Sequence, residues 1–360
     1  MALDRSRWAR PSAHQRWRNR LLCVLLCFGL SQATLAEELY VLAYQNPGTL
    51  DPLLEVFASE TGIDVRVQYL SANDLKQTLM DGSTPADVIF TLEAKRLADL
   101  VSADVLAPVA SDSLTKAVPV HFRHPDNLWF AIAKWSRSVY YAKARVDPSH
   151  ITSYQSLTAP RWRGRICVRT SNKIYVQSLL ASMIAAEGEA DARRFAEGLV
   201  ANLARPPSDL DMAQLQGVFE GACDITLANS YYYERLLAQR YDPLVPAAGK
   251  AAGELLAEVK PLAVNQDGRG VHMNVSAVAM AKRATHPAAA LRLMEYALTP
   301  LAQRLLTQPG RELPIVDSVR AGASTQLFGD FREDNLPLAE LAEHYATAER
   351  IARESGWTWK

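Results

Sequence analysis

Three consecutive tyrosines, at residues 231–233, are the side chains of this sequence best suited to chemistry. They follow a short apolar run at residues 225–227 that is typical of a buried strand, and Asn229 or Ser230 can cap a helix beginning with them. Consecutive helical side chains point about 100° apart, so the three rings cannot all be buried. Phenolate is a hard anionic donor that suits Fe³⁺. An aromatic floor under an organic ligand, or plain packing, is the alternative.

A further tyrosine, Tyr175, ends a polar turn at residues 169–175, before an expected helix. Helix N-termini and polar turns favour anions. Cys167 and Cys223 lie at the matching strand ends, and they are the two cysteines left after an N-terminal export segment is removed. An oxidising compartment favours a disulfide between them, with two buried thiols as the alternative. Such a bridge would hold Tyr175 and Tyr231 on neighbouring loops.

Neither the histidines nor the common catalytic motifs provide a competing site. Six histidines outside the N-terminal segment are scattered without the spacing of metal ligands: His121, His124, His150, His272, His286 and His344. The sequence contains no Gly-x-Ser-x-Gly motif, no phosphate-binding glycine loop and no His-Glu-x-x-His motif. We therefore expect that the protein is not an enzyme.

The first 36 residues are typical of a secretory signal. Residues 1–20 carry six arginines and one acid, residues 21–30 are apolar, and residues 34–36 form a small-residue exit. The apolar run is too short to span a bilayer, although a membrane anchor is the alternative. We therefore predict export to the periplasm.

Charge and length restrict what the exported chain can be. Six of the 39 basic residues and one of the 39 acidic residues lie in residues 1–36, so the remainder has a net charge of −5. This charge disfavours nucleic acid as a partner, because proteins that bind it are basic. About 324 residues remain, which exceeds what one core usually holds and predicts two domains.

Strand and helix patterns alternate along the chain and predict an α/β fold. Apolar or alternating runs predict strands at residues 39–44, 63–67, 86–91, 129–133, 138–141, 165–169, 222–227 and 275–281. A helix pattern follows the run at residues 39–44, and further helix patterns occur at residues 177–187, 189–202, 287–297, 299–307 and 338–354. This order favours a parallel sheet with helices on both faces. No linker separates two halves, so we expect two lobes joined by crossing strands, with a ligand cleft between them.

Several segments resemble the bacterial ferric-iron-binding proteins of ABC importers, the bacterial transferrin type. The similar segments are residues 60–65, 85–88, 162–169, 199–205, 221–224, 231–233 and 270–276. The resemblance implies that Tyr231 and Tyr232 bind iron, that Tyr233 is structural, and that the further tyrosine ligand is Tyr175. It also implies that Arg137, near the hinge, meets a bound anion or a ligand phenolate.

The first loop departs from the family pattern. Many members place a His or Tyr ligand just after the first strand, where this chain has Asn46 and Pro47. Tyr44 is nearby, and Glu93 lies one place from a carboxylate that some relatives use. Water, an external anion or Tyr44 could therefore complete the metal sphere.

The resemblance implies a two-lobed type II periplasmic binding fold. We expect one lobe at residues 37–130 with a return at 264–305, and the other at 131–263 with C-terminal helices from 306–360. The expected monomer would bind ferric iron, with or without a synergistic anion, and deliver it to an inner-membrane permease. The rival is an organic-solute binder of the same fold, for a polyamine, phosphonate or thiamine-like ligand, with cation–π contacts to the tyrosines.

Overall fold

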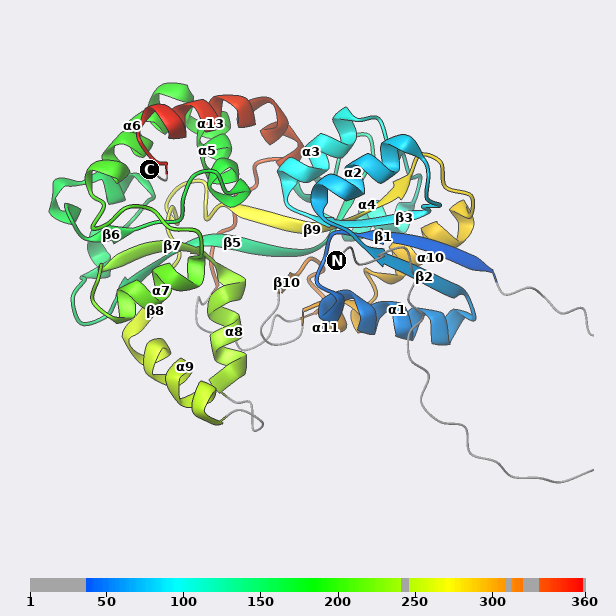
Figure 1. Ribbon diagram of the computed structural model, residues 1–360, viewed down its shortest axis with the longest axis horizontal. Coiled ribbons are helices and arrows are strands. Elements are labelled where there is room, and N and C mark those ends of the chain that lie inside the picture. The colour runs from blue at the N-terminus through cyan, green and yellow to red at the C-terminus, as the bar shows by residue number, and fades with distance from the viewer. Residues whose placement is uncertain (1–36, 241–245, 308–311, 320–329, 359–360) are drawn as a thin grey trace, which may run out of the picture.

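The computed structural model describes residues 37–240, 246–307, 312–319 and 330–358. The expected signal segment at residues 1–36 lies outside this part. Ten strands of the described chain form a continuous network whose main path runs β2-β1-β3-β9-β5-β7-β6. Figure 1 shows two groups of helices and strands at opposite ends of this path, joined by β5 and β9, which run side by side. We call these groups the first and the second lobe.

The first lobe begins as the alternation of patterns predicted. Its strands β1, β2 and β3 pair in parallel. These strands and the helices between them are β1 (Glu38–Ala43), α1 (Pro47–Thr61), β2 (Asp64–Tyr69), α2 (Ala72–Asp81), β3 (Val88–Leu92) and α3 (Ala94–Ser102). Local signals set the helix bounds: the Asn46 side chain caps α1, and Gly62 ends it in the left-handed conformation that glycine adopts most easily. The apolar side chains that predicted α1, including Leu50 and Phe57, are buried.

Shorter elements complete the first lobe. They are β4 (Leu106–Ala107), α4 (Asp112–Ala117), η1 (Val120–Phe122), α10 (Pro287–Tyr296), α11 (Pro300–Leu306) and β10 (Leu313–Pro314). Helix α10 packs on β1 and β9, and α11 packs on α1, so this late segment returns to the first lobe.

Two long strands cross between the lobes. They are β5 (Phe130–Ala142) and β9 (Met273–Ala281). The first part of β5 pairs with β9 and β10, and its second part pairs with β7 and β8. The sequence patterns predicted two strands here, and this was wrong: β5 is one strand with an irregularity between Ala131 and Ala133. Strand β5 belongs to both lobes. The residue ranges expected for the two lobes therefore stay a prediction.

The sheet is mixed, not parallel throughout as the alternation of patterns suggested. Strand β9 is antiparallel to β3 and β5, and β5 is antiparallel to β7. The parallel expectation holds for β1 to β3 and for the β6–β7 pair. Strand β5 crosses from the first lobe to the second, and β9 crosses back. The two strands therefore run in opposite directions, which makes their pairing antiparallel.

The second lobe contains the remaining strands and the helices that connect them. Its elements are η2 (Pro148–His150), η3 (Gln155–Thr158), η4 (Pro160–Trp162), β6 (Ile166–Cys167), α5 (Ile174–Glu187), α6 (Glu189–Ala201), α7 (Asp211–Phe219), β7 (Ile225–Asn229), α8 (Ser230–Arg240), α9 (Pro246–Glu258) and β8 (Val259–Leu262). The predicted disulfide is confirmed, because Cys167 at the end of β6 bonds to Cys223, just before β7. Both cysteines are buried.

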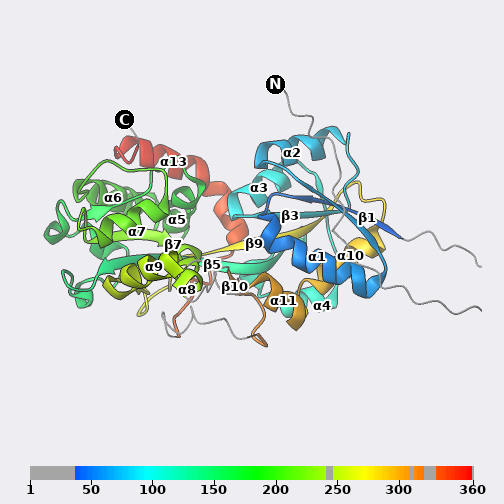
Figure 2. The same cartoon turned by 60° about the horizontal axis from the view of Figure 1, so that its bottom comes forward.

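The C-terminal segment comprises η5 (Leu338–His344) and α13 (Tyr345–Glu354). Helix α13 packs on α5 and α6, while η5 also touches α3 of the first lobe (Figure 2). The inward face predicted for this segment, which includes Leu341 and Ile351, is buried. Among the described helices, none is long and apolar enough to cross a membrane.

Candidate metal centre

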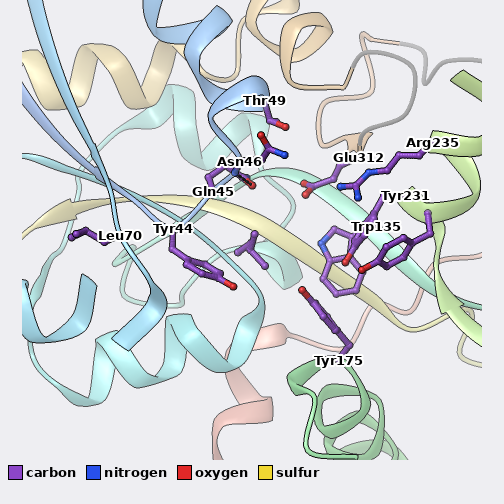
Figure 3. Close-up of a pocket in the computed structure, with 12 residues that line it drawn as sticks. Tyr44, Gln45, Asn46, Thr49, Leu70, Trp135, Tyr175, Tyr231, Arg235 and Glu312 are labelled. Atoms are coloured by element: carbon purple, nitrogen blue, oxygen red, sulfur yellow. Dashed lines mark hydrogen bonds between the residues drawn. The ribbon is translucent and has the colours of Figure 1, made fainter. Parts of the chain in front are cut away.

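A pocket of about 330 Å³ lies between the two lobes (Figure 3). The first lobe contributes the end of β1, the start of α1 and the residue before β10, while the second lobe contributes the first turns of α5 and α8. The lining residues are Tyr44, Gln45, Asn46, Thr49, Leu70, Leu92, Trp135, Tyr175, Tyr231, Tyr232, Arg235 and Glu312. The predicted cleft is therefore present, and it brings together the four tyrosines that the sequence singled out as metal ligands.

The tyrosine triplet occupies the first turn of α8, immediately after β7 ends at Asn229. The rings of Tyr231 and Tyr232 lie 4.7 Å apart and both line the pocket. Tyr233 points elsewhere: it is buried, and its hydroxyl donates to the carbonyl of Val259 at 3.0 Å. This division follows from the rotation of about 100° between helical neighbours, which turns the third ring away from the first two.

Asn229 orients Tyr231 through its side chain. Its Nδ2 donates to the Tyr231 hydroxyl at 2.9 Å, and its Oδ1 accepts from Arg137 at 2.9 Å. The sequence predicted that Asn229 or Ser230 caps α8, but the Asn229 side chain binds these two partners, and the Ser230 hydroxyl accepts from the Ser136 amide. The residue before the triplet thus fixes the direction in which the phenol points.

Tyr175 lies in the first turn of α5, not in the preceding turn where the sequence placed it. Its ring stands edge-on to Trp135 with centroids 5.4 Å apart, and Tyr231 stands edge-on to the same indole at 5.6 Å. Trp135 is thus a shared support for two phenols. Sequence analysis saw it only as part of a strand pattern.

Burial dominates the electrostatics of these phenols. It raises the pKa of Tyr175, and a hydrogen bond with Tyr231 opposes this only in part. Burial also raises the pKa of Tyr231 well above 10, and the neighbouring Tyr175 and Tyr232 raise it further. Both phenols are therefore protonated in the empty pocket at neutral pH. Only a strong cation can convert such clustered phenols to phenolates, because it removes the repulsion between them.

Arginines already face the tyrosine rings. The Arg235 guanidinium lies 5.3 Å from the ring centre of Tyr231 and 5.4 Å from that of Tyr232. Arg169 lies 5.0 Å from the ring centre of Tyr175. These guanidinium groups balance negative charge on the phenols, and they leave the ring faces less attractive to an organic cation.

Arg137 lies on β5, one of the two strands that cross between the lobes, which is the hinge region where the resemblance placed it. It is 1% exposed, does not line the pocket, and donates to Asp211 at 2.8 Å as well as to Asn229. Its charge is thus neutralised by a buried carboxylate that Arg169 also contacts, at 3.3 Å. Arg137 holds Asn229, which donates to the Tyr231 hydroxyl, so the link between Arg137 and this phenol runs through one amide side chain. Asp211 was missed because no pattern marks it.

The first lobe offers fewer donors than the second. Tyr44 lines the pocket, with the Arg96 guanidinium 4.3 Å from its ring centre. Asn46, at a position where relatives carry a ligand, uses its side chain to accept from the Gly48 amide as the cap of α1. Glu93 is fully buried and does not line the pocket. It accepts from the Lys95 amide and from Asn274. Burial raises the pKa of Glu93 to about 7, and the nearby cation Arg96 opposes this.

Glu312 is a pocket residue that sequence analysis missed. Its Oε1 accepts from the Ser276 hydroxyl at 2.9 Å, and that hydroxyl accepts from Gln45 at 3.1 Å. Burial raises the pKa of Glu312 to about 7, while the Ser276 hydrogen bond and the Arg235 charge oppose the shift. The segment around Glu312 has no periodic pattern, so nothing in the sequence connected it with tyrosines about 80 positions earlier.

No group of three or more histidine, cysteine, aspartate or glutamate side chains could hold a metal within the described ranges. The donors that converge are phenol oxygens. They suit a hard trivalent ion, whereas a softer metal would favour thiolate or imidazole.

Comparison with known proteins places this geometry in a family. The family described as bacterial extracellular solute-binding protein matches residues 39–312. The chain belongs to this family. Iron uptake protein A1 of Synechocystis is 36% identical to this solute-binding protein over 323 residues, covering 89% of the chain and 88% of the relative. The resemblance stated from sequence segments is thereby confirmed.

Solved structures agree. Trichodesmium FutA, in complex with iron and citrate, superposes with a TM-score of 0.83 at 32% identity, covering 89% of this chain and all of that one. The ferric binding protein of Campylobacter jejuni gives a TM-score of 0.78 at 30% identity, covering 88% and 99%. The two-lobed type II fold of the solute-binding protein is thus confirmed.

Proposed function

We propose that this protein captures ferric iron in the interlobe pocket and delivers it to the inner-membrane permease of an ABC importer. The observation that carries the proposal is the convergence of Tyr175, Tyr231 and Tyr232 in one pocket. Relatives across most of the chain are named for iron uptake or ferric iron binding, and one was solved with iron and citrate. A periplasmic location follows from this role and from the predicted export segment.

Charge balance supports a trivalent cargo. Three phenolates neutralise Fe³⁺, and the arginines over their rings balance the charge of a further anion such as citrate. The buried pocket strengthens each of these interactions relative to water. Closure of the lobes around the metal would then remove it from solvent and present a new surface to the permease.

The organic-solute alternative fits the pocket less well. A polyamine or thiamine-like ligand would need free aromatic faces for its positive charge. Arg235 already lies over the rings of Tyr231 and Tyr232, and Arg169 lies over that of Tyr175. An organic cation stacked on these rings would be repelled by the two guanidinium groups. The arrangement therefore favours a metal bound at the phenol oxygens over a cation stacked on the rings.

The function is tested by titrating residues 37–360 with ferric citrate while recording visible absorption. Iron–phenolate bonds absorb visible light, so we expect a coloured complex that saturates at one iron per chain. Spermidine and thiamine serve as comparison ligands in calorimetry. A colourless titration together with saturable binding of either organic cation would contradict the proposal.

A further inference from the structure

Tyr44 and Arg96 form a pair on the first-lobe side of the pocket. Arg96 Nη2 donates to the Tyr44 hydroxyl at 3.3 Å, and the guanidinium carbon lies 4.3 Å from the centre of the ring. Arg96 Nη1 donates to the carbonyl of Leu92 at 3.3 Å. The guanidinium is thus tied to the backbone just before α3 and holds Tyr44 both by its ring and by its oxygen.

The charge of Arg96 also reaches one tyrosine of the opposite lobe. This charge acts on Tyr175, where it opposes the effect of burial on the phenol pKa. The neighbouring cation Lys95 has a different role: it pairs with Asp99 at 3.4 Å and lies 5.6 Å from the ring centre of Tyr345. Of these two consecutive cations on α3, Arg96 is therefore the one that contacts a tyrosine of the pocket.

Tyr44 is the phenol that the first lobe presents to the pocket. Figure 3 shows it reaching in from β1 with its hydroxyl directed towards the side from which Tyr175 enters. Asn46 is occupied as a helix cap, and Pro47 has no side-chain donor atom. A phenolate oxygen has more than one lone pair, so it can accept from a guanidinium and bind a metal at the same time.

We propose that Arg96 is a positioning residue that holds Tyr44 as the first-lobe ligand of the metal. This inference rests on the proposed function. Guanidinium has no lone pair to donate, so Arg96 itself cannot bind the metal. Its charge compensates the fourth phenolate, which would otherwise leave Fe³⁺ and four phenolates with a net charge of −1. Closure then brings Tyr44 onto an ion already held by the second lobe.

The test is a double-substitution cycle between Arg96 and Tyr44. Iron affinity is measured by competition with citrate, and the visible band is recorded, for the unaltered chain and for Arg96→Gln, Tyr44→Phe and the double variant. We expect Arg96→Gln to weaken iron binding about tenfold and to shift the band, as loss of a charge-assisted hydrogen bond predicts. In the Tyr44→Phe background the same substitution should change affinity less than threefold, because its partner is absent.

Two further variants separate positioning from general charge effects. Arg96→Lys retains one donor and should recover part of the lost affinity. Lys95→Gln removes the same charge from the next position of α3 without touching Tyr44, and it should bind iron within about twofold of the unaltered chain. Thermal unfolding of each variant without iron checks that it is folded.

Equal losses from Arg96→Gln in both backgrounds, or no loss in either, would overturn the role of Arg96. So would a loss from Lys95→Gln as large as that from Arg96→Gln. Failure of the unaltered chain to bind iron at all would instead overturn the proposed function, and this inference with it, so the two failures are distinguishable.

Discussion

At the scale of single residues, the phenols of Tyr175 and Tyr231 are protonated before iron arrives. Burial raises the pKa of both Tyr175 and Tyr231 above the ordinary value, so neither is ionised at neutral pH in the empty protein. Iron must therefore displace protons, and acid must favour release, because protons and metal compete for the same oxygens. The affinity for iron should therefore fall as the pH falls.

This competition predicts proton release on loading. Addition of ferric citrate at pH 7 in a pH-stat should release about three protons per iron from the second-lobe tyrosines and a fourth from Tyr44, after subtraction of the value for citrate alone. Tyr231→Phe should release one proton fewer, because it lacks one displaced phenol. Iron uptake without proton release would mean that the phenols stay neutral and are not ligands.

The sequence identified the donors at this scale but not their supports. The tyrosine triplet and Tyr175 were recognised because a strand end followed by a polar helix start is a local pattern. Trp135 and Glu312 line the same pocket from segments far away in the chain, Arg96 contacts Tyr44 behind it, and no local pattern marks these residues. The role implied for Arg137 stays a prediction, and its ion pair with Asp211 could not be foreseen because it depends on packing that one sequence does not reveal.

At the scale of elements, β6 and β7 place the two helix starts that carry the tyrosines. The strands are adjacent and parallel, so α5 and α8 both begin near the same edge of the sheet. The disulfide joins Cys167 at the end of β6 to Cys223 just before β7, across 56 positions of sequence. It therefore reinforces a pairing that positions the site.

Removal of this bridge should destabilise the protein more than it disturbs the site. Cys167→Ser with Cys223→Ser should lose roughly 4 kcal/mol on the chain-entropy account, which lowers the Tm by about 5–10 °C. Iron affinity should change less than fivefold, since β6 still pairs with β7. Scanning calorimetry with and without reductant measures the effect, and the double variant should be insensitive to reductant. An unchanged Tm would show that the bridge contributes little.

Helices and strands were predicted correctly from the sequence where the segment lies within a single lobe. Helices α5, α6 and α10 lie close to their predicted ranges, and in α6 and α10 the apolar periodicity reports burial on a single face. Strand β5 was split in two because its middle carries Ser136 and Arg137, which look like a break. They can be buried because β5 crosses between the lobes, where both residues form hydrogen bonds with neighbouring strands and side chains.

At the scale of the whole molecule, the pocket depends on both lobes. Tyr44 and Glu312 enter from the first lobe and the tyrosine pair from the second, joined by β5 and β9. The two-lobed architecture followed from resemblance and from the absence of a linker. The relative position of the lobes did not, because it is set by contacts between residues that are distant in sequence.

Iron should draw the lobes together. We expect the radius of gyration from small-angle X-ray scattering to fall when iron is added to residues 37–360, because ligands on both lobes must reach one ion. Tyr44→Phe should reduce this change, since it removes a first-lobe donor but leaves the second-lobe tyrosines intact. Identical scattering with and without iron, at saturating colour, would contradict closure.

The most direct test of the account is the comparison of Tyr232→Phe with Tyr233→Phe. The first substitution keeps a ring in the pocket and deletes only a donor oxygen. The second deletes the neighbouring hydroxyl, which is hydrogen-bonded to the carbonyl of Val259 away from the pocket.

After loading with ferric citrate and removal of free iron, visible absorption and bound iron are measured for both variants and the unaltered chain. The account predicts that Tyr233→Phe retains colour and one iron per chain, while Tyr232→Phe loses most of both. Equal colour and iron in Tyr232→Phe and the unaltered chain would contradict the phenolate site.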